Sequence, residues 1–358
     1  MKKILLAGVA LCSLGAAKAD IMVTAAPQLA GDTLTVSAVS LSDVMTKSRR
    51  DLQPAITTTV VTADFTVPTT GTEPQRYDLR LGSRRATRFY ASPTDKINVS
   101  IAADGSYLIT GTPMLDQVAV LQEQLKGPYA DYSKALENND EAAASAANAA
   151  ADKILVEYVK ANPGMCGATW AVLNMEDENL LQYAPTLTGD ATTCLLYPML
   201  QNSVKRAETR QAAEKQRAEM EAGHVKAPDF ALPDLDGKTV KLSSFKGKWV
   251  ILDFWGSWCP WCIKGFPGLK SSYEKYKGKL EIIGVDCNDP EANWRAAVKK
   301  YALPWVNVYN AQTTGGVMEA YGVQAFPTKV LINPKGQIQK IYVGEDPAFY
   351  TDLDTLIK

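Results

Sequence analysis

The chain has 358 residues, of which 46% are hydrophobic and 22% are charged, a balance typical of two or three folded domains rather than of a disordered protein. Its 38 basic and 39 acidic residues give a formal net charge of −1. A nucleic-acid-binding protein would show a basic stripe, and the sequence contains none, so we expect no nucleic-acid partner.

The first 19 residues have the pattern of a signal peptide. Lys2 and Lys3 form a positive start, residues 4–14 are mainly apolar, and residues 17–19 read Ala-Lys-Ala, a small-x-small cleavage site. The apolar stretch is shorter than the ~20 residues that cross a bilayer. We therefore expect cleavage after residue 19, no membrane span in the mature protein, and a periplasmic location where disulfides form.

Residues 20–113 alternate polar and apolar side chains in short runs that turn residues separate. The runs at 77–81 and 97–101 are clear examples, and the Asp-Gly dipeptide at 104–105 is typical of a hairpin turn. This pattern predicts a β-sandwich-like antiparallel domain with one face toward water.

Residues 114–222 change to helical spacing, with a tract at 142–151 that is almost all Ala. Residues 203–221 are charged and have few apolar positions, which predicts a solvated connecting helix. The alternative, a dimerising coiled coil, would need a sustained apolar seam. The single His of the chain, His224, follows this helix, and no neighbouring residue completes a metal site there.

Residues 223–358 alternate short apolar strands with helices. We expect strands at 249–255, 280–286 and 305–309, a hairpin of 329–333 with 337–343, and helices at 259–276, 290–301 and 346–358. This alternation predicts an α/β domain with a central sheet and crossover connections.

Two thiols follow the first of these strands. Cys259 and Cys262 lie three positions apart, so their sulfurs can close a disulfide across one helical turn. Cys259 stands at the expected helix N-terminus, where unpaired backbone amides stabilise a thiolate. Cys262 lies one turn further in, which suits a thiol that resolves a mixed disulfide. Pro260 is tolerated in the first turn and stiffens it.

Asp253 lies on the apolar strand that leads to the dithiol. Burial raises the pKa of a carboxyl toward neutrality, and a carboxylate of that kind can accept the proton of Cys262. We predict this catalytic role in preference to the alternative, a hydrogen-bonded structural carboxylate, because perturbed acids gather at active sites.

With these residues the chain resembles the thioredoxin superfamily, and within it the exported TlpA/ResA-like thiol–disulfide oxidoreductases with a redoxin or AhpC/TSA-like domain. The resemblance covers residues 226–358. Its motifs are Asp253, the Trp-Cys-x-x-Cys run at 258–262, Pro267 and Phe326-Pro327-Thr328. It implies a thioredoxin fold, a redox-active Cys259–Cys262 pair and no cofactor. Residues 20–222 resemble the β-rich and helical segment that precedes such domains in exported bacterial proteins.

The resemblance also implies roles for single residues. Cys259 attacks the substrate disulfide, Cys262 resolves the mixed disulfide, and Trp258 flanks the pair. Pro327 follows a cis peptide bond and lies against the disulfide. The implied partners are proteins with disulfides as substrates and an upstream thiol as electron donor.

One position departs from the ResA-like pattern. Those proteins typically have a Glu just before the Phe-Pro of the active-site helix, where this chain has Gly265, and they often lack the strand acid that is present here as Asp253. This combination resembles general thioredoxins and argues against a dedicated role in cytochrome c maturation.

Three further cysteines remain after signal cleavage. Cys166 and Cys194 are expected to pair in an oxidising compartment, and the alternative is two unpaired buried thiols. Cys287 follows the strand at 280–286. Active sites collect at the carboxyl ends of such strands, so a third redox group is one interpretation, although an inert thiol is the favoured one.

The favoured function is that of a periplasmic oxidoreductase that reduces disulfides in exported proteins. A thiol peroxidase with antioxidant activity is an alternative, although the residues around Cys259 lack a peroxidatic motif. A second alternative is a non-enzymatic binding module with a structural disulfide. A zinc site is the weakest interpretation, because a single Cys-x-x-Cys lacks the second ligand pair.

Overall fold

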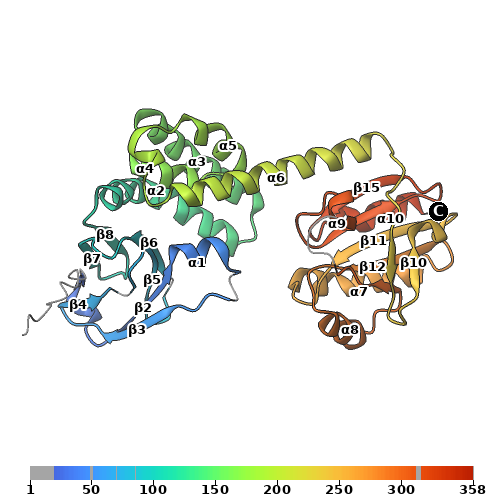
Figure 1. The fold of residues 1–358 in the computed structure, drawn as a ribbon, viewed down its shortest axis with the longest axis horizontal. Coiled ribbons are helices and arrows are strands. Elements are labelled where there is room, and N and C mark those ends of the chain that lie inside the picture. The colour runs from blue at the N-terminus through green and yellow to red at the C-terminus, as the bar shows by residue number, and fades with distance from the viewer. Residues whose placement is uncertain (1–19, 49–50, 70, 85, 312–315, 358) are drawn as a thin grey trace, which may run out of the picture. The chain divides into compact units, whose positions relative to one another are not determined.

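The computed structural model describes residues 20–357, apart from 49–50, 70, 85 and 312–315 (Figure 1). The chain forms two compact units, Met1–Ala207 and Glu208–Lys358, called unit 1 and unit 2 below. The expected signal peptide lies outside the described residues.

Unit 1 begins with two four-stranded sheets that share one hydrophobic core. The first sheet has the order β4-β1-β7-β8, and the second has the order β3-β2-β5-β6. Their strands are β1 (Asp20–Ala25), β2 (Thr33–Ser40), β3 (Ala55–Val60), β4 (Asp64–Pro68), β5 (Gln75–Leu81), β6 (Thr87–Ala91), β7 (Ile97–Ile101) and β8 (Tyr107–Thr110), and helix α1 (Leu41–Thr46) follows β2.

Alternate side chains of the strands point into this core. In β5, Tyr77, Leu79 and Leu81 are buried while the residues between them are more exposed. The described strand pairs of unit 1 are antiparallel, as expected, except that β1 and β7 run parallel. About 70 residues separate these two strands along the chain, so no tight turn dictates their relative direction. The β-rich region is therefore confirmed, with one parallel pair that the alternation did not reveal.

A helical layer follows the sheets in unit 1. Its helices are α2 (Pro113–Glu137), α3 (Glu141–Ala161), α4 (Cys166–Leu173), α5 (Asp177–Tyr183) and the first part of α6 (Tyr197–Ala222). The side chains of Thr112 and Asp140 cap α2 and α3 by accepting hydrogen bonds from first-turn amides. The Ala tract of α3 buries Ala144, Ala147 and Ala151, and such small side chains let a neighbouring helix approach closely.

The boundary between the two units falls inside α6, the helix that contains the charged stretch. In unit 2, Gln216 and Arg217 donate hydrogen bonds to backbone carbonyls of the segment 319–322. Glu221 accepts a hydrogen bond from the amide of Ile341 at 2.6 Å. The end of α6 is therefore fixed to unit 2 by its own polar side chains.

Unit 2 contains a five-stranded sheet of order β13-β12-β11-β14-β15. Its strands are β11 (Trp249–Trp255), β12 (Leu280–Asp286), β13 (Val306–Val308), β14 (Thr328–Ile332) and β15 (Ile338–Val343). Strands β11, β12 and β13 are parallel, and β14 and β15 are antiparallel to their neighbours. The helices are α7 (Pro260–Lys275), α8 (Glu291–Lys300), α9 (Gly316–Ala320) and α10 (Ala348–Leu356), and β9 (Ala231–Pro233) pairs with β10 (Thr239–Lys241). This is the thioredoxin fold that the sequence predicted.

The sheet of unit 2 has a separate hydrophobic cluster on each face. Ile251 and Trp255 of β11 pack in the cluster that includes α7, α8 and α10, whereas Leu252 and Phe254 belong to the opposite cluster. Because successive side chains of a strand point to opposite faces, Asp253 lies on the face that α7 covers.

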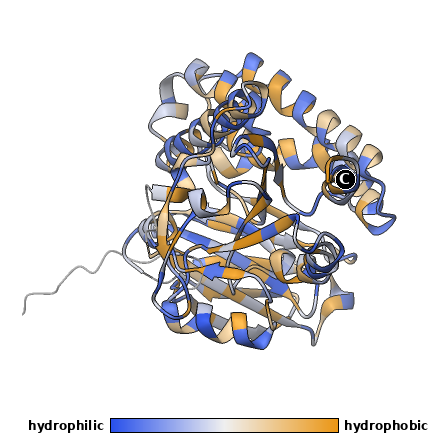
Figure 2. Cartoon of the chain, turned by 90° about the vertical axis from the view of Figure 1, so that its right-hand side faces the viewer, coloured by the Kyte–Doolittle hydropathy of each residue, from blue (hydrophilic) through white to orange (hydrophobic). Residues whose placement is uncertain are grey.

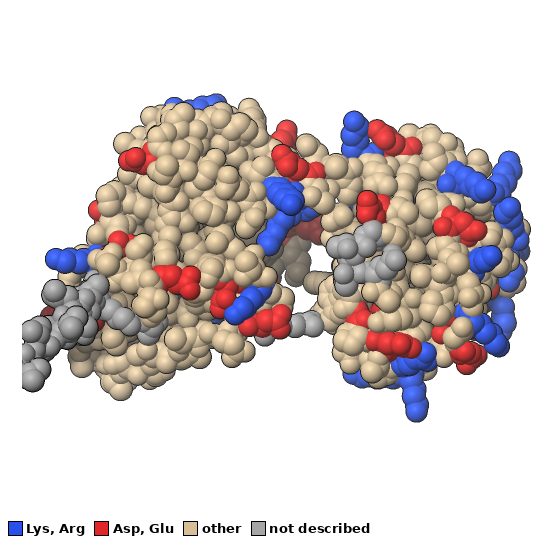
Figure 3. Space-filling model, viewed as in Figure 1, with Lys and Arg blue, Asp and Glu red and all other residues tan. Residues whose placement is uncertain are grey.

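The surface agrees with the composition. On the face that Figure 3 shows, both units carry acidic and basic side chains, and the basic ones of unit 2 gather along its right-hand edge. The helices carry both apolar and polar bands in Figure 2, as helices with one buried face do. Within residues 20–357, apart from the gaps named above, no helix has the length and apolar character that a bilayer crossing needs.

Candidate active site

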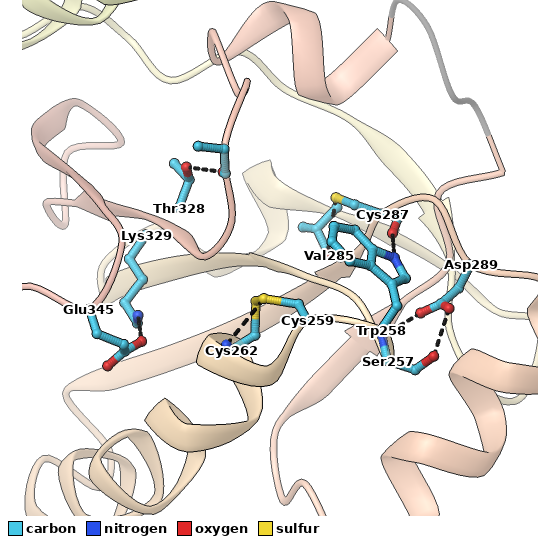
Figure 4. The surroundings of a disulfide bond; sticks show 11 residues. Ser257, Trp258, Cys259, Cys262, Val285, Cys287, Asp289, Thr328, Lys329 and Glu345 are labelled. Carbon is cyan, nitrogen blue, oxygen red and sulfur yellow. Dashed lines mark hydrogen bonds and ion pairs between the residues drawn. A yellow bond between two sulfur atoms is a disulfide. The ribbon is translucent and has the colours of Figure 1, made fainter. Parts of the chain in front are cut away.

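The dithiol lies at the start of α7 and is closed as a disulfide (Figure 4). The S–S distance of Cys259–Cys262 is 2.06 Å, and both side chains are buried. Cys259 is the N-cap of α7, and its Sγ accepts a hydrogen bond from the amide of Cys262 at 3.2 Å. On reduction, the same amide and the helix dipole favour a thiolate on Cys259 over one on Cys262.

The loop before the dithiol is held by two acceptors from the segment after β12. Ser257 donates from its amide and its hydroxyl to the carboxylate of Asp289, at 2.6 and 2.7 Å. Trp258 donates from Nε1 to the carbonyl of Cys287 at 3.0 Å. The Trp258 ring also packs edge-on against Phe326, with centroids 5.2 Å apart. These contacts fix the approach to Cys259.

The Phe326–Pro327 peptide bond is cis, as the resemblance implied. The residue after it, Thr328, donates from its hydroxyl to the carbonyl of Ala325 at 2.8 Å. This contact ties the two sides of the cis-proline turn together at the start of β14.

Asp253 is buried on β11, with 1% of its surface exposed. Burial raises its pKa to about 6; the Lys329 ammonium acts against this shift, and the Glu345 carboxylate adds to it. Among the described residues, Oδ1 of Asp253 has no hydrogen-bond partner. A carboxyl with this pKa can take up and release a proton near neutral pH, which is what a proton acceptor for Cys262 requires.

Sequence reasoning missed a buried ion pair on the same face. Lys329 is the β14 residue opposite Asp253, its side chain is 2% exposed, and its Nζ lies 2.5 Å from Oε1 of Glu345. A Lys in the middle of an apolar strand, two residues after Pro327, was the signal available in the sequence. Nothing in the sequence near Glu345 identifies its partner.

Gly265 of α7 provides the space for the Glu345 carboxylate. A Cβ atom at position 265 would lie 2.9 Å from Oε2 of Glu345 and closer still to Oε1. Nearby, the hydroxyl of Tyr350 donates to the carbonyl of Gly265 at 3.4 Å. Burial, followed by the charges of Glu345 and Asp253, raises the pKa of Tyr350 to about 12.

Cys287 lies in the cluster on the opposite face of the sheet from the dithiol. Its thiol is fully buried and donates to the carbonyl of Val285 at 3.5 Å. Burial, with smaller contributions from Asp286 and Asp253, raises the pKa of the thiol well above its usual range. The structure therefore agrees with an inert thiol, and the backbone carbonyl of Cys287 is the group that serves the site.

Cys166 and Cys194 are free thiols in the structure, although the sequence predicted a disulfide between them. The two side chains lie within hydrogen-bonding contact, and each thiol donates to a backbone carbonyl at 3.5 Å, Cys166 to Asp190 and Cys194 to Ala191. Burial and the neighbouring Cys194 raise the pKa of Cys166 to about 11. The pairing of these thiols in an oxidising compartment stays a prediction.

The described residues contain no group of three or more His, Cys, Asp or Glu that could hold a metal ion. The polar groups at the site are the dithiol, carboxyls, one ammonium, the hydroxyls of Ser257 and Tyr350, the Trp258 indole and backbone groups. This set supports proton transfer and thiol–disulfide exchange.

Comparison with known proteins finds a family match within unit 2 and relatives that are similar to about a third of the chain. Residues 224–341 match the AhpC/TSA family. The ResA thiol-disulfide oxidoreductase of Bacillus thuringiensis subsp. konkukian is 39% identical over 127 residues, which cover 35% of this chain and 72% of the relative. The chain belongs to the ResA-like thiol–disulfide oxidoreductases.

Other known proteins are also similar to part of this chain. ResA of Halalkalibacterium halodurans is 38% identical over 119 residues, and the chain spans 66% of that relative and 65% of ResA from Bacillus subtilis, about two thirds of each. The thioredoxin domain of a thiol-disulfide oxidoreductase from Bacteroides vulgatus matches with 30% identity and a TM-score of 0.36, over 38% of this chain and 97% of that domain. The residues that match the AhpC/TSA family all lie in unit 2 of this ResA-like protein.

Proposed function

We propose that this protein is an exported thiol–disulfide oxidoreductase that reduces disulfides in other exported proteins. The observation that carries the proposal is the Cys259–Cys262 disulfide at the N-terminus of α7, on the same face of the sheet as the buried carboxyl of Asp253. The signal-peptide pattern of residues 1–19 supports export.

The reduced protein would act in two exchange steps. The Cys259 thiolate attacks one sulfur of the client disulfide, which forms a mixed disulfide and releases the other client sulfur as a thiolate that takes a proton from water. Cys262 then passes its proton to Asp253 and attacks the Cys259 sulfur, which releases the second client sulfur as a thiolate that also takes a proton from water. The client gains two electrons, and the protein is left with the Cys259–Cys262 disulfide. An upstream dithiol donor must then return two electrons.

A cleft in unit 2 offers a place for the client chain. It has a volume of about 680 Å³, and its lining includes Ala212 and Ala213 of α6, Asn288, and the segment 322–324. Phe326 also lines it and packs against Trp258, the neighbour of Cys259. A client strand in this cleft would lead its disulfide toward Cys259.

Turnover of insulin disulfides by the full-length mature protein, with dithiothreitol as the electron donor, tests the proposal. We expect Cys259→Ser to abolish turnover and Cys262→Ser to trap clients as mixed disulfides. Cys287→Ala, a matched removal of a thiol from the opposite face of the sheet, should leave turnover intact. Turnover by Cys259→Ser at the rate of the unaltered protein would overturn the proposal. The reduction potential, measured in glutathione or dithiothreitol buffers, gives the direction of exchange.

The match to the AhpC/TSA family makes peroxide the second substrate to test. Cys259 is flanked by Trp258 and Pro260 rather than by a peroxidatic motif. We therefore expect hydrogen peroxide to be consumed no faster than by a free thiol. Rapid consumption that depends on Cys259 would instead favour the peroxidase.

A further inference from the structure

The carboxylate of Glu345 occupies a site that α7 leaves open by having no side chain at position 265. Glu345 lies between β15 and α10, 80 positions away from Gly265 in the sequence. Since a Cβ at 265 would stand within 2.9 Å of the atoms of that carboxyl group, only a glycine there admits the carboxylate in its present position.

Lys329 connects this carboxylate to the catalytic face. It stands opposite Asp253 in the β11–β14 register, on the face that α7 covers, and its ammonium contacts Glu345 at 2.5 Å. A buried ammonium needs a partner, because an isolated charge in a protein interior is costly. Glu345 supplies that partner, so the Lys329 ammonium does not depend on an ionised Asp253 for its counter-charge.

The charges of the three residues balance when Asp253 holds a proton. With Lys329 positive and Glu345 negative, a neutral Asp253 gives a cluster of zero net charge, and an ionised Asp253 gives −1. Besides Lys329 and Glu345, the groups that interact with the charge of Asp253 are Tyr350 of α10 and, from the opposite face of the sheet, the Cys287 thiol; the disulfide of α7 lies on the same face as Asp253. None of these carries a positive charge, so Lys329 is the cation that acts on Asp253.

The three residues of the cluster, Asp253, Lys329 and Glu345, differ in how much of their side chains is exposed to solvent. Asp253 is 1% exposed and the Lys329 side chain is 2% exposed, whereas 22% of the Glu345 side chain is exposed. Glu345 is therefore the residue of the three that contacts solvent. A proton that leaves Asp253 can reach water past Lys329 and Glu345.

We propose that Glu345 and Lys329 are positioning residues that set when Asp253 takes up and releases the proton of Cys262, with Gly265 as the opening that lets Glu345 reach the site. The inference rests on the proposed exchange reaction and assigns its proton control to residues of α7, of β14 and of the segment after β15. During resolution, the proton moves from the Cys262 sulfur to Asp253, and from there to water beside Glu345, while the Cys262 sulfur bonds to Cys259.

Carbon-13 NMR titration of the Asp253 carboxyl in the full-length oxidised protein tests the proposal, because Cys259 and Cys262 do not titrate as a disulfide. Glu345→Gln removes a negative charge and should lower the titration midpoint, whereas Lys329→Met removes a positive charge and should raise it, each by about one pH unit. Glu345→Asp should largely restore the midpoint of the unaltered protein. Glu274→Gln, a charge change on the exposed side of α7, is the matched control and should leave the midpoint unchanged.

A steric variant tests the role of Gly265. Gly265→Ala should push the carboxylate away and shift the midpoint as Glu345→Gln does, and it should add no further shift in the Glu345→Gln background. Circular dichroism checks that each variant is folded, and Glu345→Gln, at a partly exposed position, provides the test if Lys329→Met does not fold.

Two results would overturn the proposal. In the first, the Asp253 midpoint of Glu345→Gln stays within about 0.2 pH unit of that of the unaltered protein, the smallest shift that the titration resolves. In the second, Glu345→Gln and Lys329→Met shift the midpoint in the same direction. Failure of the unaltered protein to reduce insulin would overturn the proposed function instead, and the NMR titration would still decide the role of Glu345.

Discussion

Replacement of Asp253 by Asn should stabilise unit 2 while it slows disulfide exchange. The pKa of the buried carboxyl is about 6, against an ordinary value of 3.8. The folded state therefore binds the proton more tightly than the unfolded state does. The stability that this proton provides is complete below pH 3.8 and is lost as the pH rises through 6.

The difference of about 2.2 pKa units corresponds to about 3 kcal/mol, at 1.36 kcal/mol for each unit. Asn is neutral at every pH and close to Asp in shape. We expect Asp253→Asn to match the unaltered protein near pH 4 and to exceed its free energy of unfolding by about 3 kcal/mol above pH 7. Resolution by Cys262 should slow by roughly 100-fold, because water must accept the proton.

Urea unfolding between pH 4 and 8, followed by tryptophan fluorescence in the oxidised protein, measures the effect. Six of the seven Trp residues belong to unit 2, so the signal reports mainly on that unit. Asp236→Asn, in the exposed turn between β9 and β10, is the matched control, and His224→Gln, which removes the single His of the chain, is a second control. A gap between Asp253→Asn and the unaltered protein that does not grow with pH would refute the reasoning.

Three further substitutions test other contacts. Cys287→Ala should keep full insulin turnover and lower the free energy of unfolding by about 1 kcal/mol, because it leaves a small cavity. A loss of turnover would show that the Cys287 thiol takes part in the exchange reaction. Asp289→Ala removes the acceptor of two hydrogen bonds from Ser257. The free energy of unfolding of unit 2 should therefore fall by about 1–3 kcal/mol, and the rate of attack on client disulfides should fall as well. Unchanged kinetics would show that the loop before the dithiol does not need these hydrogen bonds. Oxidation should join Cys166 to Cys194 and stabilise unit 1 by about 3–4 kcal/mol through a loop of about 28 residues, whereas peptide mapping that finds both thiols alkylated after oxidation would exclude the bond.

The sequence predicted those parts of unit 2 that depend on local patterns. The apolar run at 249–255, the Cys-x-x-Cys spacing and Pro327 gave the central strand, the dithiol and the cis peptide bond. Asp253 stood out because a carboxyl group inside an apolar strand is costly to bury, so its presence there indicates a specific role. Each of these signals lies within a few residues of the group that it identifies.

The parts that the sequence did not reveal depend on distant contacts. Gly265 looked like a missing acid, because the carboxylate that fills its place comes from Glu345, beyond the end of β15. The partner of Lys329 could not be predicted either, because its position in a strand does not show which carboxylate neutralises its charge. Strands β1 and β7 also pair in parallel although about 70 residues separate them, so no local sequence pattern reveals this pairing.

The hydrogen bonds of Gln216, Arg217 and Glu221 define where an independent redox fragment must begin. The family match starts at residue 224, but the side chains that hold the segment 319–322 and the amide of Ile341 come from α6, before that point. A fragment cut at 224 would lose these anchors and leave the approach to Phe326 without its helical wall, whereas a fragment that starts at Glu208 would keep both. The last turns of α6 are thus a part of the thioredoxin unit that the family match does not include.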